Sequence, residues 1–257
     1  MKNSSSSRCI AITGASSGIG RATALRFAEA KENLVLIGRD RAALAAVEKE
    51  ATAKGAQTQI VEADLCAEGA AQQVIAAILD RFSRLDVLVN AAGIITLGTI
   101  ENTSLAEWDR MMDINVRVVF QLMQAAVPPL EKTKGNIVNV SSITGLRSFP
   151  NVLAYCVSKA ALDQLTRCAA LDLAPKGVRV NAVNPGVVVT NLHRRSGFDE
   201  KKYAAFLEHS KTTHPLGRVG TPEEIAELIF FLASDQAGWI TGETISIDGG
   251  RQLTCAR

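Results

Sequence analysis

The sequence has few aromatic residues and few histidines, and its cysteines form no recognised motif. Aromatic residues make up 5% of the 257 residues, so aliphatic side chains must fill the core, as in parallel sheets covered by helices. The three histidines are too far apart to predict a metal site, and we expect no metal. The five cysteines, Cys9, Cys66, Cys156, Cys168 and Cys255, include no CxxC pair, which favours reduced thiols in a cytoplasmic protein.

Long apolar runs and an excess of one charge are also absent. No stretch reaches the roughly 18 apolar residues needed to cross a bilayer, and the polar N-terminal segment has no signal-peptide core. The 28 basic and 26 acidic residues nearly balance, and no basic block is interleaved with aromatics. We therefore expect neither a membrane nor a nucleic acid as partner.

Short β-branched or aliphatic runs alternate with segments of helical apolar spacing. The runs predict seven strands, at 9–13, 34–38, 57–62, 85–90, 136–141, 178–184 and 243–248. Helices are predicted at 18–31, 41–54, 67–83, 115–130, 153–174 and 221–234, with Pro128-Pro129 helping to stop the fourth. This order predicts one α/β domain over 1–257, a doubly wound parallel sheet of about seven strands with helices on both faces.

The segment 187–220 is the one long stretch without a regular pattern. It contains Gly197, Pro215 and Gly217 and is rich in Lys, Arg and His. A loop of this length in a compact domain is usually functional or mobile. We interpret it as a substrate lid, partly helical over about 199–210. Its cations either meet an acidic substrate or form a solvated charged surface.

Three glycines follow the first predicted strand and open the next helix. Gly14 permits a tight turn, Gly18 lets the backbone approach a pyrophosphate, and Gly20 lets the helix pack closely on the strand. The helix N-terminus then turns free N–H groups toward the anion. The alternative is a glycine-rich turn without a ligand, because the GxxxGxG spacing is a variant of the usual fingerprint.

The end of the second predicted strand bears on which dinucleotide binds. An acidic residue that would hold the ribose 2′-hydroxyl of NAD is expected where Gly38 stands. Arg39, beside it, can pair with the 2′-phosphate of NADP. The sequence therefore favours NADP, and Asp40, one position later, keeps NAD as an alternative.

Tyr155 and Lys159 are four residues apart in a predicted helix and so share one face. Carbonyl reduction needs a proton donor beside the oxygen, and a nearby ammonium lowers the pKa of a phenol.

Ser142 ends the fifth strand, at the sheet edge where such folds bind ligands, and can hold the substrate oxygen. Its alternatives are a capping role and competition from Ser141. Asn115 begins a predicted helix, either as its N-cap or as the holder of a water behind Lys159.

Together these residues resemble the short-chain dehydrogenase/reductase family over nearly the whole chain. The matching motifs are TGASSGIG (13–20), Asp64-Leu65, Asn90-Ala91-Ala92-Gly93, Asn115, Ser142, YCVSK (155–159), Pro185-Gly186 and Thr190. The resemblance implies a Rossmann fold in which Tyr155 is the general acid/base and Lys159 lowers its pKa. It also implies that Ser142 orients the carbonyl and that Asn115 supports a proton relay.

The resemblance further implies a cofactor groove. Asp64 and Leu65 would contact adenine, Asn90 and Gly93 would line the groove, and Val188 and Thr190 would meet the nicotinamide amide. The full set of implied contacts is Gly14, Ser16, Ser17, Gly18, Ile19, Gly20, Arg39, Asp64, Leu65, Asn90, Ala91, Gly93, Tyr155, Lys159, Pro185, Gly186, Val188 and Thr190. NADP-preferring relatives often carry a basic residue where Ser17 stands, so the preference for NADP depends on Arg39 alone.

Three functions compete. The leading hypothesis is reversible, NADP-dependent reduction of a small ketone or aldehyde by a homodimer or homotetramer, since the family assembles through helices at 115–130 and 153–174. The first alternative is 3-oxoacyl-acyl carrier protein reductase, although Leu171 replaces one carrier-binding arginine and only Lys132 or Lys134 could replace another. The remote alternative, a non-catalytic dinucleotide-binding regulator, conflicts with the intact catalytic positions.

Overall fold

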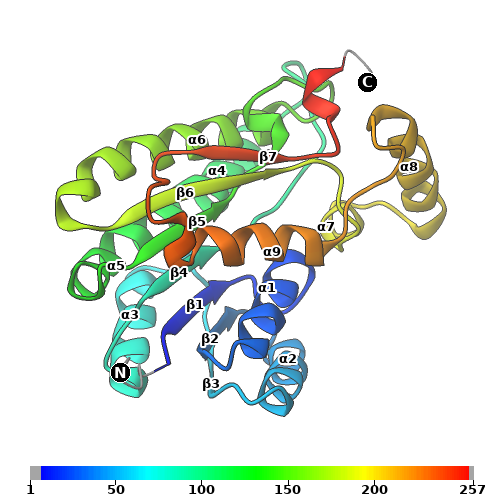
Figure 1. Ribbon diagram of the computed structural model, residues 1–257. Coiled ribbons are helices and arrows are strands. Elements are labelled where there is room, and N and C mark those ends of the chain that lie inside the picture. Colours follow the sequence, from blue (N-terminus) through cyan, green and yellow to red (C-terminus); the bar gives the residue numbers. More distant parts are fainter. Residues whose placement is uncertain (1–6, 255–257) are drawn as a thin grey trace.

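Seven parallel strands form one sheet in the computed structural model, which describes residues 7–254 (Figure 1). Their spatial order is β3-β2-β1-β4-β5-β6-β7. The strands are β1 (Cys9–Thr13), β2 (Asn33–Gly38), β3 (Thr58–Glu62), β4 (Val87–Asn90), β5 (Asn136–Val140), β6 (Arg179–Pro185) and β7 (Thr244–Ile247). All seven predicted strands are confirmed, with ends shifted by at most two residues.

Helices cover both faces of this sheet (Figure 1). One face carries α1 (Gly18–Glu29), α2 (Arg41–Ala53) and α9 (Pro222–Leu232). The other carries α3 (Ala70–Phe82), α5 (Val118–Thr133) and α6 (Leu153–Leu173), with α4 (Leu105–Met112) packed against α6. The predicted doubly wound α/β fold is therefore confirmed.

Alternating side chains of the strands build a separate core on each face. In β1, Ile10 and Ile12 join the cluster under α1, α2 and α9, whereas Cys9 and Ala11 join the cluster under α3, α5 and α6. Successive strand residues point to opposite faces, and both faces are covered. This double burial explains why the strands read as continuous apolar runs in the sequence.

One predicted helix is wrong in both its beginning and its end. Helical structure runs from Leu105 through α4, a π-helical segment (Asp113–Arg117) and α5, so Asn115 lies inside a helix rather than at its N-cap. Pro128-Pro129 do not stop α5, which continues to Thr133 and ends at Lys134 in a left-handed conformation. The prolines are tolerated because the carbonyls that lose their i+4 partners belong to residues 124 and 125, which are at least partly open to water.

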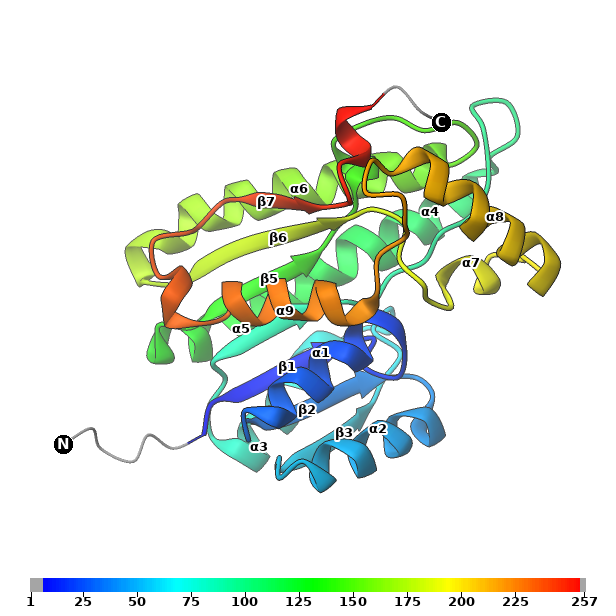
Figure 2. The same cartoon turned by 45° about the vertical axis from the view of Figure 1, so that its right-hand side comes forward.

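The predicted lid is partly helical and extends beyond the carboxyl ends of the strands (Figure 2). It contains α7 (Leu192–Arg195) and α8 (Glu200–Thr213). The buried His214 ring joins the two ends of the lid, because its Nε2 accepts from the Val187 N–H at 3.1 Å and its Nδ1 lies 2.6 Å from the Ser210 carbonyl. The lid is thus tied to the end of β6.

The strand order reverses between β1 and β4, and the helices α1 and α5, which follow these strands, pack on opposite faces of the sheet. Ligands of wound α/β sheets bind in the crevice at such a point. Within the described part of the chain no helix is long and apolar enough to cross a membrane. Cys9, Cys66, Cys156 and Cys168 are free thiols, and Cys255 lies outside the described residues.

Candidate active site

A cavity of about 890 Å³ opens at the carboxyl ends of β1, β4, β5 and β6. Tyr155, Lys159 and Ser142 line it together with fifteen of the predicted cofactor contacts. These are Gly14, Ser16, Ser17, Gly18, Ile19, Gly20, Arg39, Asp64, Leu65, Ala91, Gly93, Pro185, Gly186, Val188 and Thr190. Ser141, which adjoins Ser142, also lines the cavity. Asn90 and Asn115 do not line the cavity and are buried behind it. Asn90 instead donates to Asn139 Oδ1 at 2.9 Å and braces the neighbouring strand β5.

The glycine turn fits a pyrophosphate group. Gly14 has a φ of +66°, and a Cβ there would lie 2.9 Å from the Ala92 backbone. A Cβ on Gly20 would overlap the Gly14 carbonyl at 2.3 Å, so only glycine lets α1 start this close to β1. No side chain caps the N-terminus of α1. Its free N–H groups and partial positive charge are therefore open to an anion in the cavity.

Two charged residues that follow β2 differ in whether their side chains already have partners in the protein. Asp40 is the N-cap of α2, and its Oδ1 accepts from the Ala43 N–H at 3.0 Å. Arg39 is exposed on the cavity wall, and its guanidinium has no ion pair with any of residues 7–254. The carboxylate beside the ribose position is thus occupied by helix capping, whereas the cation is open to a ligand.

Tyr155 and Ser142 meet in the middle of the cavity. Ser142 caps a 3₁₀ turn (Ile143–Gly145) and accepts from the Thr144 N–H at 3.2 Å, so the capping role is present. Its side chain also lies close enough to the Tyr155 phenol to lower the pKa of that phenol. Ser141 instead donates to the Lys159 carbonyl at 3.3 Å and braces α6. Of the two serines, Ser142 is therefore the one positioned beside the phenol.

Burial dominates the acid–base properties of this pair. It raises the pKa of Tyr155 to about 12, against a smaller lowering by the Ser142 hydrogen bond. It lowers the pKa of Lys159 to about 8, with the Asp163 carboxylate acting in the opposite direction. The Lys159 Nζ lies 5.7 Å from the Tyr155 ring centre and donates to the Val140 carbonyl at 2.7 Å.

Asn115 reaches the site from the π-helical segment. Its Oδ1 accepts from the Ile94 N–H at 2.9 Å, and its Nδ2 donates to the Ile94 carbonyl at 2.9 Å and to Ser158 Oγ at 3.1 Å. A Cβ on Gly93 would lie 3.3 Å from Asn115 Oδ1 and 3.7 Å from Lys159 Nζ. The missing side chain of Gly93 therefore leaves a space between the amide and the ammonium.

Two buried groups behind Lys159 escaped the sequence prediction. Asp163, one turn further along α6, accepts from Asn184 Nδ2 at 2.9 and 3.1 Å. Desolvation raises the pKa of this carboxyl group, while hydrogen bonds from Ser141 and Asn184 lower it. The spacing Lys159–Asp163 repeats the i, i+4 interval of Tyr155–Lys159 and was the available signal.

The lid contributes one contact to the glycine turn. Arg195 in α7 donates from Nη2 to Ser17 Oγ at 3.2 Å and lines the cavity. Ser17 stands where a basic residue was noted as missing from the turn itself. Arg195 of the lid thus places a positive charge next to the turn, where the motif itself has none. Arg194, its neighbour, instead pairs with Glu200 at 2.6 Å on the exposed side.

The far end of the cavity, beyond Tyr155, is aromatic and carries one cation. Its residues come from four separate segments: Phe149, His193, Phe206 and Arg251. His193 packs between Phe198 and Phe206, with ring centres 5.7 and 4.4 Å away. Burial, and then the charge of Arg251, lower the pKa of His193 to about 4, so the ring is neutral at pH 7. No local spacing links these residues, and Arg251 was not among the predicted site residues.

Fold and site together define a dinucleotide-dependent oxidoreductase, and comparison with known proteins gives the family. A family model described as Enoyl-(Acyl carrier protein) reductase matches residues 14–252. The chain belongs to the short-chain dehydrogenase/reductase family and is an oxidoreductase acting on a CH–OH group with NAD(P). The resemblance inferred from the motifs is confirmed.

Relatives of this chain are named for different substrates. The chain is 36% identical to 3-oxoacyl-[acyl-carrier-protein] reductase FabG of Thermotoga maritima, covering 93% of this chain and 95% of that protein. It is also 36% identical to a 3beta-hydroxysteroid dehydrogenase of Mediterraneibacter gnavus, covering 93% and 92%. A short-chain dehydrogenase/reductase of unknown function from Caenorhabditis elegans, solved with cofactor, is 36% identical with a TM-score of 0.91 and 96% coverage of both chains. The family thus fixes the reaction class but not the substrate.

Proposed function

We propose that this protein reduces a ketone or aldehyde to an alcohol with NADP as cofactor and Tyr155 as proton donor. The observation that carries the proposal is that the Tyr155 phenol and Ser142 line one cavity, close to each other, together with the uncapped N-terminus of α1. A carbonyl held by Ser142 in that cavity lies next to a proton donor and within the dinucleotide groove.

Proton transfer is the part of the reaction that the chain itself supplies. The nicotinamide, when bound, gives a hydride to the carbonyl carbon or takes one from the alcohol. With a pKa raised to about 12, Tyr155 is protonated at neutral pH and so carries a proton that it can give to the substrate oxygen. The Ser142 hydroxyl steadies that oxygen as it gains negative charge.

Lys159 and Asn115 act behind the phenol. With a pKa of about 8, Lys159 is mostly protonated at pH 7, and an ammonium 5.7 Å from the ring stabilises the phenolate left after proton transfer. The space beside Gly93 is bordered by the side-chain oxygen Oδ1 of Asn115 and by Nζ of Lys159. We assign it to a water that returns a proton to Tyr155, with Asn115 holding that water.

The preference for NADP has support on both sides of the ribose position. Arg39 has no ion pair with the described residues and can pair with a 2′-phosphate. Asp40 already accepts a hydrogen bond as the N-cap of α2, which makes it a weaker candidate for binding a ribose 2′-hydroxyl. Arg195 beside Ser17 adds a further cation over the phosphate-binding turn.

Assembly into a homodimer or homotetramer accompanies this function. Phe120 on α5 and Val157 and Leu171 on α6 are exposed large apolar residues, and Trp239 is fully exposed. These exposed apolar side chains on α5, α6 and the 238–250 segment favour self-association over a monomer.

The deciding experiment measures NADPH consumption over a panel of ketones, aldehydes, sugars and 3-oxoacyl thioesters. Turnover that disappears in Tyr155→Phe while NADPH still binds supports the proposal. Turnover that survives in Tyr155→Phe assigns the proton to another group. NADPH binding without turnover of any carbonyl would favour a regulator over an enzyme.

A 3-oxoacyl-acyl carrier protein substrate is the second candidate, supported by the name of the Thermotoga maritima relative. The carrier-binding cations expected for it are weak here. Leu171 is exposed in place of an arginine, and Lys134 donates to the Lys176 carbonyl at 3.0 Å. Reduction of the carrier-bound thioester at least 10-fold better than a short thioester would favour this candidate, since carrier contacts act mainly through electrostatic steering.

A further inference from the structure

Arg251 differs from the other arginines that line the cavity, Arg39 and Arg195, because it is half-buried whereas they are exposed. Among residues 7–254 it forms no ion pair, and its Nε is enclosed with no hydrogen-bond partner. Arg179, which is similarly buried, donates to the carbonyls of Leu232, Ile240 and Ser234. Buried charges in proteins are normally paired or hydrogen-bonded. A half-buried arginine that lines a cavity, forms no ion pair with the described residues and keeps Nε without an acceptor therefore points to a ligand.

Hydrogen bonds fix the backbone around Arg251 and so fix the position from which its side chain extends. Arg251 opens a 3₁₀ turn (Arg251–Leu253) directly after Gly250. The Asp248 carboxylate accepts from the N–H groups of Gly250 at 3.0 Å and of Gln252 at 2.6 Å. Arg147 donates to the carbonyls of Gln252 and Thr254 from outside. The carboxylate nearest to Arg251 along the chain is thus used to build the turn.

Neighbouring side chains fix the guanidinium in the substrate half of the cavity. Its carbon lies 4.9 Å from the centre of the Phe149 ring, which packs against one side of the cation. His193 lines the same end and is neutral at pH 7, so it adds a hydrogen-bonding group without a charge. The acidic residues that line the cavity, Asp40 and Asp64, follow β2 and β3 and belong to the cofactor side.

We propose that Arg251 binds a carboxylate of the substrate, so that this enzyme acts on oxo acids or the corresponding hydroxy acids. The inference rests on the proposed carbonyl reduction. The carbonyl lies against Ser142 and Tyr155, and the carboxylate lies against the planar fork of Arg251, which matches its two oxygens. The apolar carbons between the two groups pack among the aromatic side chains of the far end.

The test compares each oxo acid with its own methyl ester at saturating NADPH. A series from 2-oxobutanoate to 6-oxoheptanoate moves the carbonyl away from the carboxylate one carbon at a time. We expect at least one acid to exceed its ester in kcat/KM by about 10- to 100-fold, the range of a charged hydrogen bond. Esters turned over as well as every acid would overturn the proposal while leaving carbonyl reduction intact.

Variants then separate direct contact from general attraction. Arg251→Met should lower kcat/KM for the acid far more than for its ester, so that the preference for the acid disappears. Arg194→Met is the matched control, because it removes a neighbouring lid cation that pairs with Glu200 outside the cavity. It should keep the preference for the acid. Equal losses in both variants would mean that net charge, and not Arg251, selects the substrate.

The comparison of acid and ester in the wild-type protein needs no variant and so stands even where Arg251→Met fails to fold. Silence toward acids and esters alike, with other ketones reduced, would also overturn the proposal. Silence toward all carbonyls, with NADPH bound, would instead be the failure of the proposed function.

Discussion

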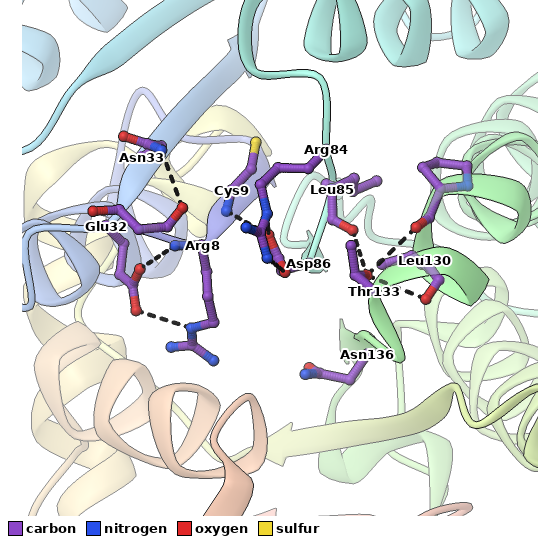
Figure 3. Close-up of polar contacts among 12 residues, drawn as sticks. Arg8, Cys9, Glu32, Asn33, Arg84, Leu85, Asp86, Leu130, Thr133 and Asn136 are labelled. Atoms are coloured by element: carbon purple, nitrogen blue, oxygen red, sulfur yellow. Dashed lines mark hydrogen bonds and ion pairs between the residues drawn. The ribbon is translucent and has the colours of Figure 1, made fainter. Parts of the chain in front are cut away.

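The two edges of the sheet treat their polar groups in opposite ways. At the amino edge, where the strands begin, charged side chains close on backbone groups and on each other (Figure 3). Asp86 accepts from the Cys9 N–H at 2.8 Å and from Arg84 at 2.6 Å, and Glu32 accepts from the backbone and side chain of Arg8. At the carboxyl edge, the N-terminus of α1 is uncapped and Arg251 forms no ion pair with any of residues 7–254. The charged groups of the amino edge are thus paired within the chain, although Asn136 Oδ1 lacks a partner there, whereas the carboxyl edge is left open for ligands.

This difference separates stability from function within one domain. A polar network whose hydrogen bonds are all made stabilises the fold and has no free group for a ligand. Buried groups without partners lower the stability of the fold, and a ligand that pairs with them restores it. Substitutions at the amino edge should therefore change unfolding but not turnover. Substitutions at the carboxyl edge should do the reverse.

The largest expected effect is on turnover at the carboxyl edge. Tyr155→Phe removes the proposed proton donor and keeps the ring, so we expect kcat to fall by about 10²- to 10⁴-fold, typical of general acid catalysis. The Tm should change little, because the core around the ring is retained. The measurement is steady-state NADPH oxidation beside thermal unfolding. A full rate in the variant would contradict the assignment of Tyr155.

The next effect is on stability at the amino edge. Asp86→Ala leaves the buried Cys9 N–H without its acceptor and removes the ion pair with Arg84, whose side chain is about one-third exposed. After discounting that exposed pair, we expect a loss of about 2–3 kcal/mol in unfolding free energy. The Tm should fall by roughly 5–10 °C, with kcat unchanged per folded molecule.

A matched control for that loss is Asp80→Ala on the exposed side of α3. It should alter the unfolding free energy by less than about 0.5 kcal/mol. If both variants unfold at the wild-type temperature, the amino-edge network contributes nothing measurable.

A smaller effect is expected at the adenine end of the cavity. Arg39→Ala should weaken NADP binding by about 1–3 kcal/mol through the lost contact with the 2′-phosphate, and should leave NAD binding unchanged. Calorimetric titration with both dinucleotides gives the ratio. Arg41→Ala is the control, since Arg41 lies two residues away and outside the cavity lining. An unaltered NADP to NAD ratio in Arg39→Ala would refute the role of Arg39.

The smallest effect is the acid sensitivity of the lid. Burial lowers the pKa of His193 from 6.5 to about 4 and also lowers that of His214. The unfolded chain thus binds protons at a higher pH than the folded chain. The stabilising contribution is complete above pH 6.5 and is lost as the pH falls toward 4. His193→Phe should therefore gain a few degrees in Tm relative to wild type between pH 6.5 and 4.5. Parallel Tm curves over that interval would argue against the titration of His193.

Most of the fold was predictable because its signals are local. Buried parallel strands give apolar runs, the glycine turn follows directly on β1, and Tyr155 and Lys159 share a face at the i, i+4 interval. Helix α4 was missed although a local signal existed. Ser104 and Glu107 form a capping box at its start, but Met111 is its one fully buried residue, so its apolar pattern is weak.

The far end of the cavity could not be predicted from local spacing. His193 lies 44 residues after Phe149 and 58 residues before Arg251 in the sequence. The three residues meet because the lid and the C-terminal turn both lie over the same strand ends. The direction of the Lys159 side chain toward the Val140 carbonyl likewise depends on the packing of α6 against β5. Such contacts follow from topology rather than from any periodic pattern.

The π-helical segment at Asp113–Arg117 makes the position of Asn115 sensitive to chain length. A π turn corresponds to an α-helix with one residue inserted, and each residue of an α-helix advances the side-chain direction by about 100°. Deleting one residue there would restore regular winding and rotate α4 relative to α5. Asn115 would then turn away from the Ile94 backbone while α5 stayed packed on α3. Among single-residue deletions in 105–133, those within Asp113–Arg117 should therefore disturb folding least. The same deletions should reduce catalysis most.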